Sequence, residues 1–190
     1  MDIEFKRVNK AFDGRPVLEG FSAVFPEGRV SAITGPSGQG KTTVLRLLSG
    51  ELKPDSGEIS GLSDKRVSMV FQEDRLVGAL SVKDNLAMVL PKDRWGAIEP
   101  ALCALGLEGA APRQAAKLSG GMRRRVAILR AMLVPFDLLL LDEPFKGLDK
   151  ALLEICARTI REKAQGKTVV LVTHDEREAR LLGAENWIAL

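Results

Sequence analysis

The fold of this chain is decided by the stretch Gly35-Pro-Ser-Gly-Gln-Gly-Lys-Thr-Thr43. An apolar run, Val30–Thr34, comes before it, and the largely apolar Val44–Leu48 comes after it. This order of strand, glycine-rich loop and helix is the context in which the pattern G-x-x-x-x-G-K-S/T marks a phosphate-binding loop. The alternative interpretation is an ordinary glycine-rich turn between a strand and a helix.

The residue types of the loop explain how it would bind phosphate. Glycines let the backbone curl so that successive N–H groups face phosphate oxygens, and the first helical turn adds free N–H groups and a positive dipole end. Lys41 would place a positive charge at the β- and γ-phosphates, and we expect its side chain to be exposed. Thr42 would offer its hydroxyl to Mg²⁺, which keeps other positions for water and phosphate. The loop residues expected to bind the nucleotide are Gly35, Pro36, Ser37, Gly38, Gln39, Gly40, Lys41, Thr42 and Thr43.

Length and charge favour one globular domain with a mixed surface. The chain has 190 residues, and 28 basic against 25 acidic side chains leave a net charge of +3. This small excess argues against a nucleic-acid protein driven by bulk charge. The two cysteines form no C-x-x-C pair, so neither a disulfide framework nor a zinc site is indicated. The aliphatic runs are far shorter than the roughly 20 residues that span a bilayer, so any membrane work is expected of another chain.

Residues 2–25 alternate between apolar and polar side chains around the turn signal Asp13-Gly14, which predicts an antiparallel hairpin. A further short strand is expected at Glu58-Ile59. Phe12 lies upstream of the phosphate loop, and we expect its ring to stack on the adenine of a nucleotide. A packed aromatic side chain of the β region is the alternative.

Four short runs predict a second, mainly parallel sheet: Arg29–Thr34, Arg66–Phe71, Asp137–Asp142 and Thr168–Thr173. Two of them contain apolar stretches without alternation, which is typical of strands buried on both faces, and helical segments lie between the runs. Ligands of such sheets bind at the carboxyl ends of the strands. The residues with useful chemistry cluster at those ends, namely Gly35–Thr42, Gln72, Asp142, Glu143 and His174.

Asp142 and Glu143 are expected to point to opposite faces if their strand continues, so that one serves a metal and the other addresses a water. Two ordinary strand-end acids are the alternative. His174 is the only histidine of the chain. A lone histidine is more often structural, but its place at the same sheet edge favours a functional role.

Residues 76–118 contain no convincing strand and predict an inserted helical subdomain. Ser81–Asp84 is similar to a capping box, and Ser119 is a natural N-cap for the amphipathic helix that follows. With that helix, the subdomain spans about residues 76–133. Three arginines, Arg123–Arg125, fall in the first helical turn, where the helix dipole disfavours cations. We interpret them as a solvated face, with an electropositive tip that meets an anion as the alternative.

Together these motifs resemble those of the ATP-binding cassette (ABC) ATPases. The phosphate loop and the aliphatic run ending in Asp142-Glu143-Pro144 are shared by many nucleotidases, whereas Leu118-Ser-Gly-Gly-Met122 just before that run is specific. The resemblance covers nearly the whole chain. It implies an α/β P-loop NTPase fold, RecA-like with a mainly parallel sheet, an antiparallel β subdomain and an inserted helical subdomain, in a single domain over residues 1–190.

The resemblance also implies cofactors and roles. ATP and Mg²⁺ would be bound, Glu143 would be the general base, and His174 would contact the γ-phosphate. Asp149 would lie at an interface between two copies. The expected Mg²⁺ ligands are Thr42, Gln72 and Asp142, the last through a metal-bound water. The residues expected to reach ATP held by a second copy are Ser119, Gly120 and Gly121.

The implied function is the ATP-hydrolysing subunit of a transporter. Two ATPs would be sandwiched in a head-to-tail dimer, a homodimer or a pair with another ABC ATPase, at the cytoplasmic face of the membrane. The dimer would be bound to integral-membrane permease subunits and, through them, to an extracytoplasmic substrate-binding protein. An exporter subunit and a soluble ABC ATPase of repair, translation or cofactor assembly are the alternatives. A P-loop kinase is a third, and Ser119–Gly121 and Glu143 count against it.

Narrower features are similar to importers of the nitrate/sulfonate/taurine kind, above all Thr173–Ala179 and Ser119–Val126. Lys146-Gly147 is an unusual pair before Leu148-Asp149. We expect exposed apolar side chains near Gln72 to dock the permease. The candidates are Leu76, Val77, Leu80 and Val82.

Overall fold

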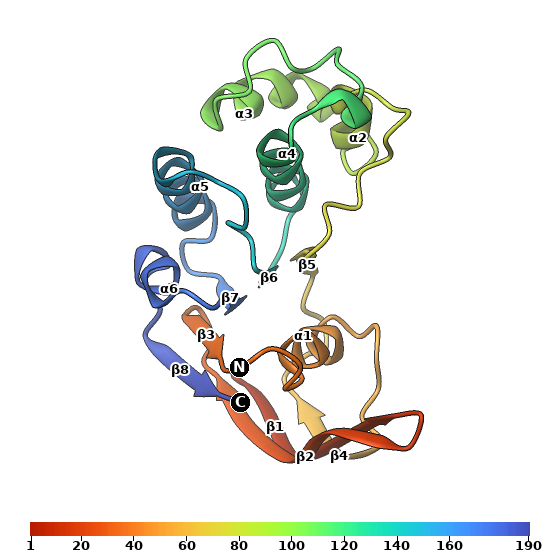
Figure 1. Cartoon of the computed structure of the whole chain (residues 1–190), viewed down its shortest axis with the longest axis vertical. Coiled ribbons are helices and arrows are strands. Elements are labelled where there is room, and N and C mark those ends of the chain that lie inside the picture. Colours follow the sequence, from red (N-terminus) through yellow and green to blue (C-terminus); the bar gives the residue numbers. More distant parts are fainter.

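Two β-sheets organise the chain (Figure 1). The computed structural model describes all of residues 1–190. One sheet is antiparallel, with strand order β2-β1-β4, and consists of β1 (Ile3–Phe12), β2 (Arg15–Phe25) and β4 (Ser56–Ser60). The other is entirely parallel, with strand order β5-β6-β7-β3-β8, and consists of β3 (Val30–Thr34), β5 (Val67–Val70), β6 (Leu138–Asp142), β7 (Thr168–Val172) and β8 (Asn186–Ala189).

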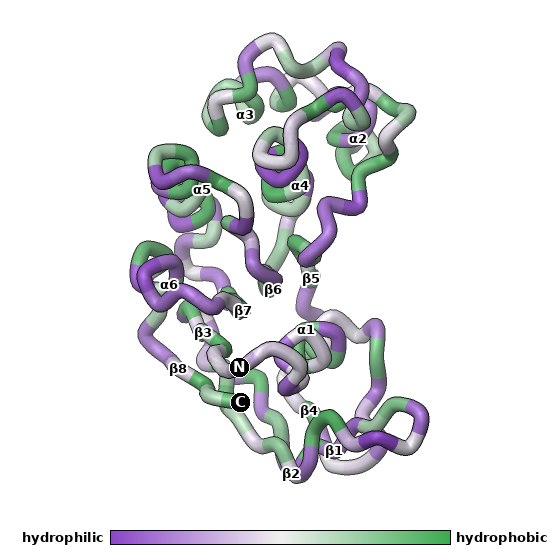
Figure 2. The backbone as a smooth tube through the Cα atoms, viewed as in Figure 1, coloured by the Kyte–Doolittle hydropathy of each residue, from purple (hydrophilic) through white to green (hydrophobic).

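Helices cover both faces of the parallel sheet. They are α1 (Lys41–Leu48), α2 (Val82–Ala87), α3 (Ile98–Ala104), α4 (Gly120–Leu133), α5 (Lys150–Lys163) and α6 (Glu176–Leu182), with the 3₁₀ turns η1 (Lys92–Ala97) and η2 (Ala115–Lys117). Figure 1 shows α2, α3 and α4 at one end of the molecule and β1, β2 and β4 at the other. Helices α4 and α5 each carry hydrophobic and hydrophilic sides (Figure 2). None of the helices combines the length and the apolar character that crossing a bilayer requires.

The central strands are buried on both faces, which confirms the prediction from their unbroken apolar runs. In β6, Leu139 and Leu141 pack into the core shared with α4 and α5, whereas Leu138 and Leu140 pack into the core shared with α1 and the antiparallel sheet. All four side chains are fully buried. A strand that must fill two cores has no polar positions, and so it shows no alternation.

The predicted capping residues fulfil that role. The hydroxyl of Ser81 accepts from the N–H of Asp84 at 3.0 Å, and the hydroxyl of Ser119 accepts from the N–H of Met122 at 3.2 Å. Each therefore satisfies one of the free donors in the first turn of its helix. Val82 was predicted to be one of the exposed apolar side chains that dock the permease, and this prediction is wrong because Val82 is fully buried. Val77, another of those candidates, is 43% exposed. Val82, the first residue of α2, packs into the same hydrophobic core as Leu86 of this helix.

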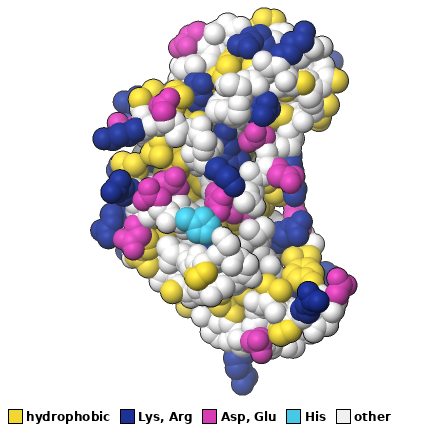
Figure 3. Space-filling view, in the orientation of Figure 1, with side chains coloured by type: hydrophobic (Ala, Val, Ile, Leu, Met, Phe, Trp, Pro, Cys, Tyr) yellow, Lys and Arg dark blue, Asp and Glu magenta, His cyan; other side chains and the backbone are white.

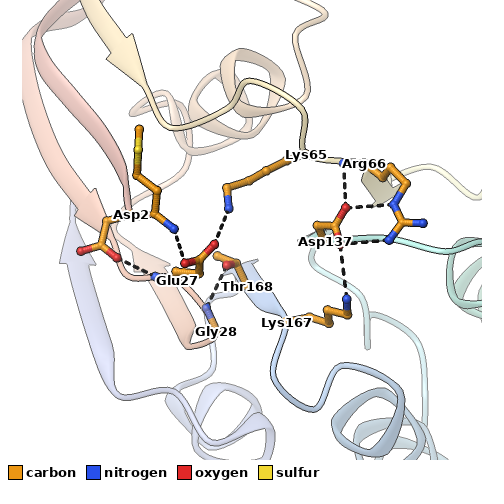
Figure 4. A network of polar contacts seen from close by, with 9 residues as sticks. Asp2, Glu27, Gly28, Lys65, Arg66, Asp137, Lys167 and Thr168 are labelled. Carbon is orange, nitrogen blue, oxygen red and sulfur yellow. Dashed lines mark hydrogen bonds and ion pairs between the residues drawn. The ribbon is translucent and has the colours of Figure 1, made fainter.

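Ion pairs lie at the amino ends of the parallel strands, on the edge of the sheet opposite the predicted nucleotide site (Figure 4). Asp137 accepts two hydrogen bonds from the guanidinium of Arg66, at 2.9 and 3.0 Å, and one from Lys167 at 3.3 Å. These contacts hold the pKa of Asp137 well below its usual range. Glu27 pairs with the N-terminal amine and Lys65, and these contacts lower its pKa to about 2.

Candidate functional site: a nucleotide-binding edge

The glycine-rich loop joins β3 to α1 at the carboxyl edge of the parallel sheet. Gly35 has φ of +139°, and a Cβ there would lie 2.2 Å from the carbonyl oxygen of Leu190. Gly40, the residue before α1, has φ of +88°, and a Cβ there would lie 2.9 Å from Leu18. These positions require glycine because both the backbone conformation and the neighbouring atoms exclude a side chain. The tight curl leaves Ser37, Gly38 and Gln39 exposed.

Lys41 does not have the exposed side chain that we expected. It is only 6% exposed, and its Nζ donates to the carbonyl oxygens of Gly35 and Pro36, each at 2.7 Å. The loop curls over the side chain, and its inward carbonyls attract the ammonium group. The lysine charge is thus already held at the centre of the phosphate loop.

Thr42, Asp142 and Gln72 form an oxygen-rich group beside this lysine. The hydroxyl of Thr42 donates to Oδ2 of Asp142 at 3.0 Å, and Gln72 lines the same cavity. Asp142 is only 2% exposed, and burial raises its pKa, although the Thr42 hydrogen bond opposes the shift. A hydroxyl, a carboxylate and an amide oxygen suit Mg²⁺, which takes oxygen ligands and retains water and phosphate oxygens. The donor set therefore fits this ion.

Glu143 and His174 form a second pair. Nε2 of His174 lies 2.8 Å from Oε1 of Glu143, and Gln72 and Lys146 each approach Oε2 at 3.5 Å. Strand β6 ends at Asp142, where the predicted run ends, so the condition under which Asp142 and Glu143 would point to opposite faces is not met; Glu143 has φ of +45°. Its N–H donates to the carbonyl of Val172, at the end of β7. This left-handed residue turns the chain away from the sheet while its carboxylate still faces the cavity.

These groups line one cavity of about 330 Å³. In Figure 3 the single histidine, His174, lies on the surface with acidic side chains near it. Phe12 lines the cavity from the end of β1 and is 38% exposed, while Gly35, Pro36 and Gln39 of the loop do not line it. The lining residues are Phe12, Val17, Ser37, Gly38, Gly40, Lys41, Thr42, Thr43, Gln72, Asp142, Glu143, Val172 and His174.

Three predicted site residues are not brought to this cavity by their own chain. Ser119, Gly120 and Gly121 lie at the start of α4, and the first two are exposed. Gly121 packs against the loop before α5, since a Cβ there would lie 3.5 Å from the carbonyl of Gly147. Ser119 and Gly120 are therefore open to solvent and do not line the cavity of the same chain.

Our interpretation of the three arginines is wrong for two of them. Arg124 and Arg125 are 3% and 7% exposed. Arg124 donates to carbonyls at the ends of strands β5 and β6, and Arg125 donates to the carbonyls of Leu105 and Gly106 at 2.7 Å. These two arginines do not form a solvated face, and Arg124 also pairs with the carboxylate of Asp74 at 3.4 Å. They are the fifth and sixth residues of α4 and so lie beyond its first turn.

One acidic and one basic residue at the site, Glu178 and Lys146, were not among the predicted site residues. Glu178 of α6 accepts a hydrogen bond from the hydroxyl of Thr173, the residue before His174, and burial raises its pKa. Lys146 is exposed beside Glu143. Both line a polar cavity of about 510 Å³ that adjoins the first through Ser37, Gln72, Glu143 and His174.

This site and sheet are those of an ATP-binding cassette ATPase. Residues 18–146 match the family model described as ABC transporter, and the chain belongs to this family. A solved structure, the dimeric post-hydrolysis state of the ATP-binding cassette MJ0796 bound to ADP and Pi, has a TM-score of 0.88 and 28% identity, covering 99% of this chain and 94% of that chain. The chain is an ATP-binding, ATP-hydrolysing cassette.

Curated relatives extend the comparison. The intermembrane phospholipid transport system ATP-binding protein MlaF of Escherichia coli (strain K12) is 36% identical over 98% of this chain and 76% of its own length. The spermidine/putrescine import ATP-binding protein PotA of Lawsonia intracellularis is 40% identical over 93% of this chain, which spans 53% of that protein. A sulfate/thiosulfate import ATP-binding protein CysA, from Mesorhizobium japonicum, is 37% identical over 94% of this chain and 58% of its own length.

Proposed function

We propose that this chain is the ATP-binding subunit of an ABC transporter, which works as a head-to-tail dimer and drives separate integral-membrane permease subunits. The observation that carries the proposal is the convergence of three groups at one sheet edge. These are the phosphate loop around Lys41, the Thr42–Asp142 pair and the Glu143–His174 pair. In this proposal, residues 1–190 form one ATPase domain with a helical subdomain over about residues 76–133.

The phosphate loop binds the triphosphate in this proposal. The outward N–H groups from Ser37 to Thr43 surround the phosphates, and the Nζ of Lys41 exchanges its two carbonyl partners for phosphate oxygens. Phe12 stacks on the adenine from the exposed end of β1. Thr42, Gln72 and Asp142 would hold Mg²⁺, which would neutralise negative charge on the phosphates.

Glu143 accepts the proton of the attacking water. The water oxygen bonds to the γ-phosphorus, the bond from that phosphorus to the bridging oxygen breaks, and ADP leaves with phosphate as the second product. His174, 2.8 Å from Glu143, holds the carboxylate in place and addresses the γ-phosphate. Phosphoryl transfer depends mainly on positioning and electrostatics. The loop around Glu143 supplies the positioning.

The second copy completes each site. Ser119, Gly120 and Gly121 reach the ATP of the partner, which is supported by the exposure of Ser119 and Gly120 and by the absence of all three from the lining of their own cavity. Asp149 lies at the interface between copies, where its carboxylate also caps α5 by accepting from the N–H of Leu152 at 2.9 Å. The dimeric form of MJ0796 supports this arrangement.

We infer import as the direction of transport, with the chain attached to the cytoplasmic face of the membrane through its permease. The names of the PotA and CysA relatives describe import proteins, whereas that of MlaF describes phospholipid transport between membranes. Similarity to importers of the nitrate/sulfonate/taurine kind, including a substrate-binding protein outside the cytoplasm, stays a proposal based on the stretches Thr173–Ala179 and Ser119–Val126.

The permease contact can be tested at Val77, an exposed apolar side chain between Gln72 and α2. A tagged wild-type chain, purified from detergent-solubilised membranes of its own cells, should bring a multispanning membrane protein with it. Val77→Asp should lose that protein and still bind ATP. The matched control is Val24→Asp, because Val24 is 47% exposed on the antiparallel sheet. Wild-type preparations without any membrane partner would contradict the proposal.

A further inference from the structure

Arg124 is a buried guanidinium whose bonds go almost entirely to backbone carbonyls. Its side chain donates at 2.8 Å to Pro144, at 2.5 Å to Phe71, and at 2.7 Å to both Asp142 and Glu143. Arginine has five N–H donors in a rigid, planar fork. Those four short bonds, with longer ones to Gln72 and Asp74 at 3.4 Å, use all of them.

The bonded carbonyls belong to the two loops that carry the catalytic groups. Phe71 and Gln72 follow β5, Asp142 is the last residue of β6, and Glu143 and Pro144 follow it. Carbonyls where a strand ends have no sheet partner, and a buried carbonyl without a donor is costly. A single side chain therefore satisfies both loops and fixes the distance between Gln72 and Glu143.

Arg124 also belongs to a different unit of the structure, helix α4. It lies five residues, about one and a half helical turns, after Ser119, the cap of that helix and the start of the loop expected to reach the partner's ATP. Over this short distance the helix backbone is rigid, because each residue is hydrogen-bonded to the next turn. Any displacement of the start of α4 therefore acts on the carbonyls of Gln72 and Glu143 through one guanidinium.

We propose that Arg124 is a positioning residue, which couples the Ser119–Gly121 loop of each copy to Gln72 and Glu143 of its own nucleotide site. The inference rests on the proposed function, in which those two side chains act on ATP and the loop acts on the partner's ATP. When α4 contacts the partner copy, the same movement then aligns the carboxylate of Glu143, which polarises the attacking water.

Arg125 offers a matched control. It is the next residue of α4, it is buried to a similar extent, and it also donates to carbonyls at 2.7 Å. The partners in its two short bonds, however, are Leu105 and Gly106, which follow α3 inside the helical subdomain, and a longer bond of 3.3 Å goes to the carbonyl of Gly121 in its own helix. Loss of either arginine removes buried hydrogen bonds, but only loss of Arg124 frees the catalytic loops.

The experiment compares Arg124→Met with Arg125→Met in the full chain. Three quantities are measured: the thermal midpoint, the affinity for a non-hydrolysable ATP analogue, and kcat for ATP hydrolysis well below both midpoints. Both variants should melt earlier than wild type. Arg124→Met should lower kcat about tenfold or more, since small misplacements of reacting groups are costly, while its nucleotide affinity changes less than about threefold. Arg125→Met should keep kcat within about threefold of wild type at that temperature.

Equal losses of kcat in the two variants, or normal kcat in Arg124→Met, would overturn the coupling role. A wild-type chain without ATPase activity would instead overturn the proposed function. If Arg124→Met does not fold, Arg124→Gln takes its place, because it retains two N–H donors and should keep part of kcat. As a further readout, low millimolar guanidinium should restore kcat to Arg124→Ala and not to Arg125→Ala. Failure of that rescue in a folded Arg124→Ala variant counts against the proposal.

Discussion

Asp142 combines deep burial with a negative charge, which makes it the residue with the clearest electrostatic cost. Burial raises its pKa, and the nearby charge of Glu143 adds to the shift, while the Thr42 hydroxyl, Arg124 and Lys41 oppose it. A carboxyl group with a raised folded-state pKa costs stability once the pH exceeds its ordinary value, because the folded protein must then hold a desolvated anion. A bound cation would reverse that cost.

We therefore expect Asp142→Asn to stabilise the nucleotide-free protein at pH 7, by roughly 1–4 °C in the thermal midpoint. The gain should shrink as the pH falls from the raised folded-state pKa of Asp142 to the ordinary pKa of an aspartate, because the wild-type carboxyl group is then protonated in both states. The variant should also lose most of the additional stabilisation that MgATP gives wild type. Melting curves at several pH values, with and without MgATP, measure both effects. A variant that melts below wild type at pH 7 without nucleotide would contradict this account.

At the residue scale, the sequence patterns predicted which side chains lie at the candidate site. They did not predict the hydrogen-bond partners of Lys41 and Arg124. The phosphate loop, Asp142 and Glu143 followed from local motifs. The burial of Lys41 and the contacts of Arg124 did not, because their partners are backbone carbonyls. Every residue carries a carbonyl, so its availability depends on where strands end in space and leaves no trace in the local sequence.

Helix α4 is the element on which the proposed two-copy site depends. Ser119 caps its start, Arg124 ties the helix to the loops after β5 and β6, and Arg125 ties it to the end of α3 within the helical subdomain. The cap hydroxyl is exposed, so a larger side chain there meets the partner before it meets its own chain.

Ser119→Arg should abolish the ATP-dependent dimer and leave ATP binding to the monomer intact. A bulky cation would collide with the partner at the triphosphate, and the lost cap costs about 1 kcal/mol of stability. Sedimentation with ATP, in a background that does not hydrolyse it, measures the dimer. The control is Ser81→Arg, which removes the equivalent cap of α2. Normal dimers of Ser119→Arg would remove that loop from the interface.

Elements were predicted well where their periodicity was unambiguous. The unbroken apolar runs of β6 and β7 gave buried parallel strands, and the turn Asp13-Gly14 gave the hairpin of β1 and β2. The end of β6 at Asp142 agrees with the predicted run Asp137–Asp142, but the left-handed conformation of Glu143, which non-glycine residues seldom adopt, was not predictable. The hydrogen bond from its N–H to Val172 on the neighbouring strand imposes it, which is a tertiary effect.

On the scale of the whole molecule, chemistry and stability lie at opposite edges of the parallel sheet. Asp137 joins the residues before β5 and β7 through Arg66 and Lys167 (Figure 4). Because these partners hold its pKa low, the ionised form contributes stability above the ordinary pKa of an aspartate, and this stability is lost as the pH falls through the depressed folded value.

Asp137→Asn should therefore lower the thermal midpoint at pH 7, with a difference from wild type that narrows in acid and at high salt. Asparagine keeps the size of the side chain but loses the charge that pairs with both cations. ATP hydrolysis at low temperature should match wild type, since the substitution lies at the amino edge of the strands. Thermal melts and a steady-state ATPase assay on the same preparation test this separation. A loss of turnover in the folded variant would show that the two edges are not independent.

The central claim is that two copies share two ATPs and that Glu143 accepts the proton of the attacking water. A general base contributes about 10²–10⁴-fold to the rate, and Glu143→Gln keeps the size while removing proton affinity and one negative charge beside the triphosphate. The direct measurement is the molecular mass of Glu143→Gln in solution with and without MgATP, together with its rate of ATP hydrolysis. We predict turnover at least about 10²-fold below wild type and conversion from monomer to stable dimer on adding ATP. Near-normal turnover would contradict the role of Glu143, and slow turnover by a chain that stays monomeric with ATP bound would contradict the shared two-site mechanism.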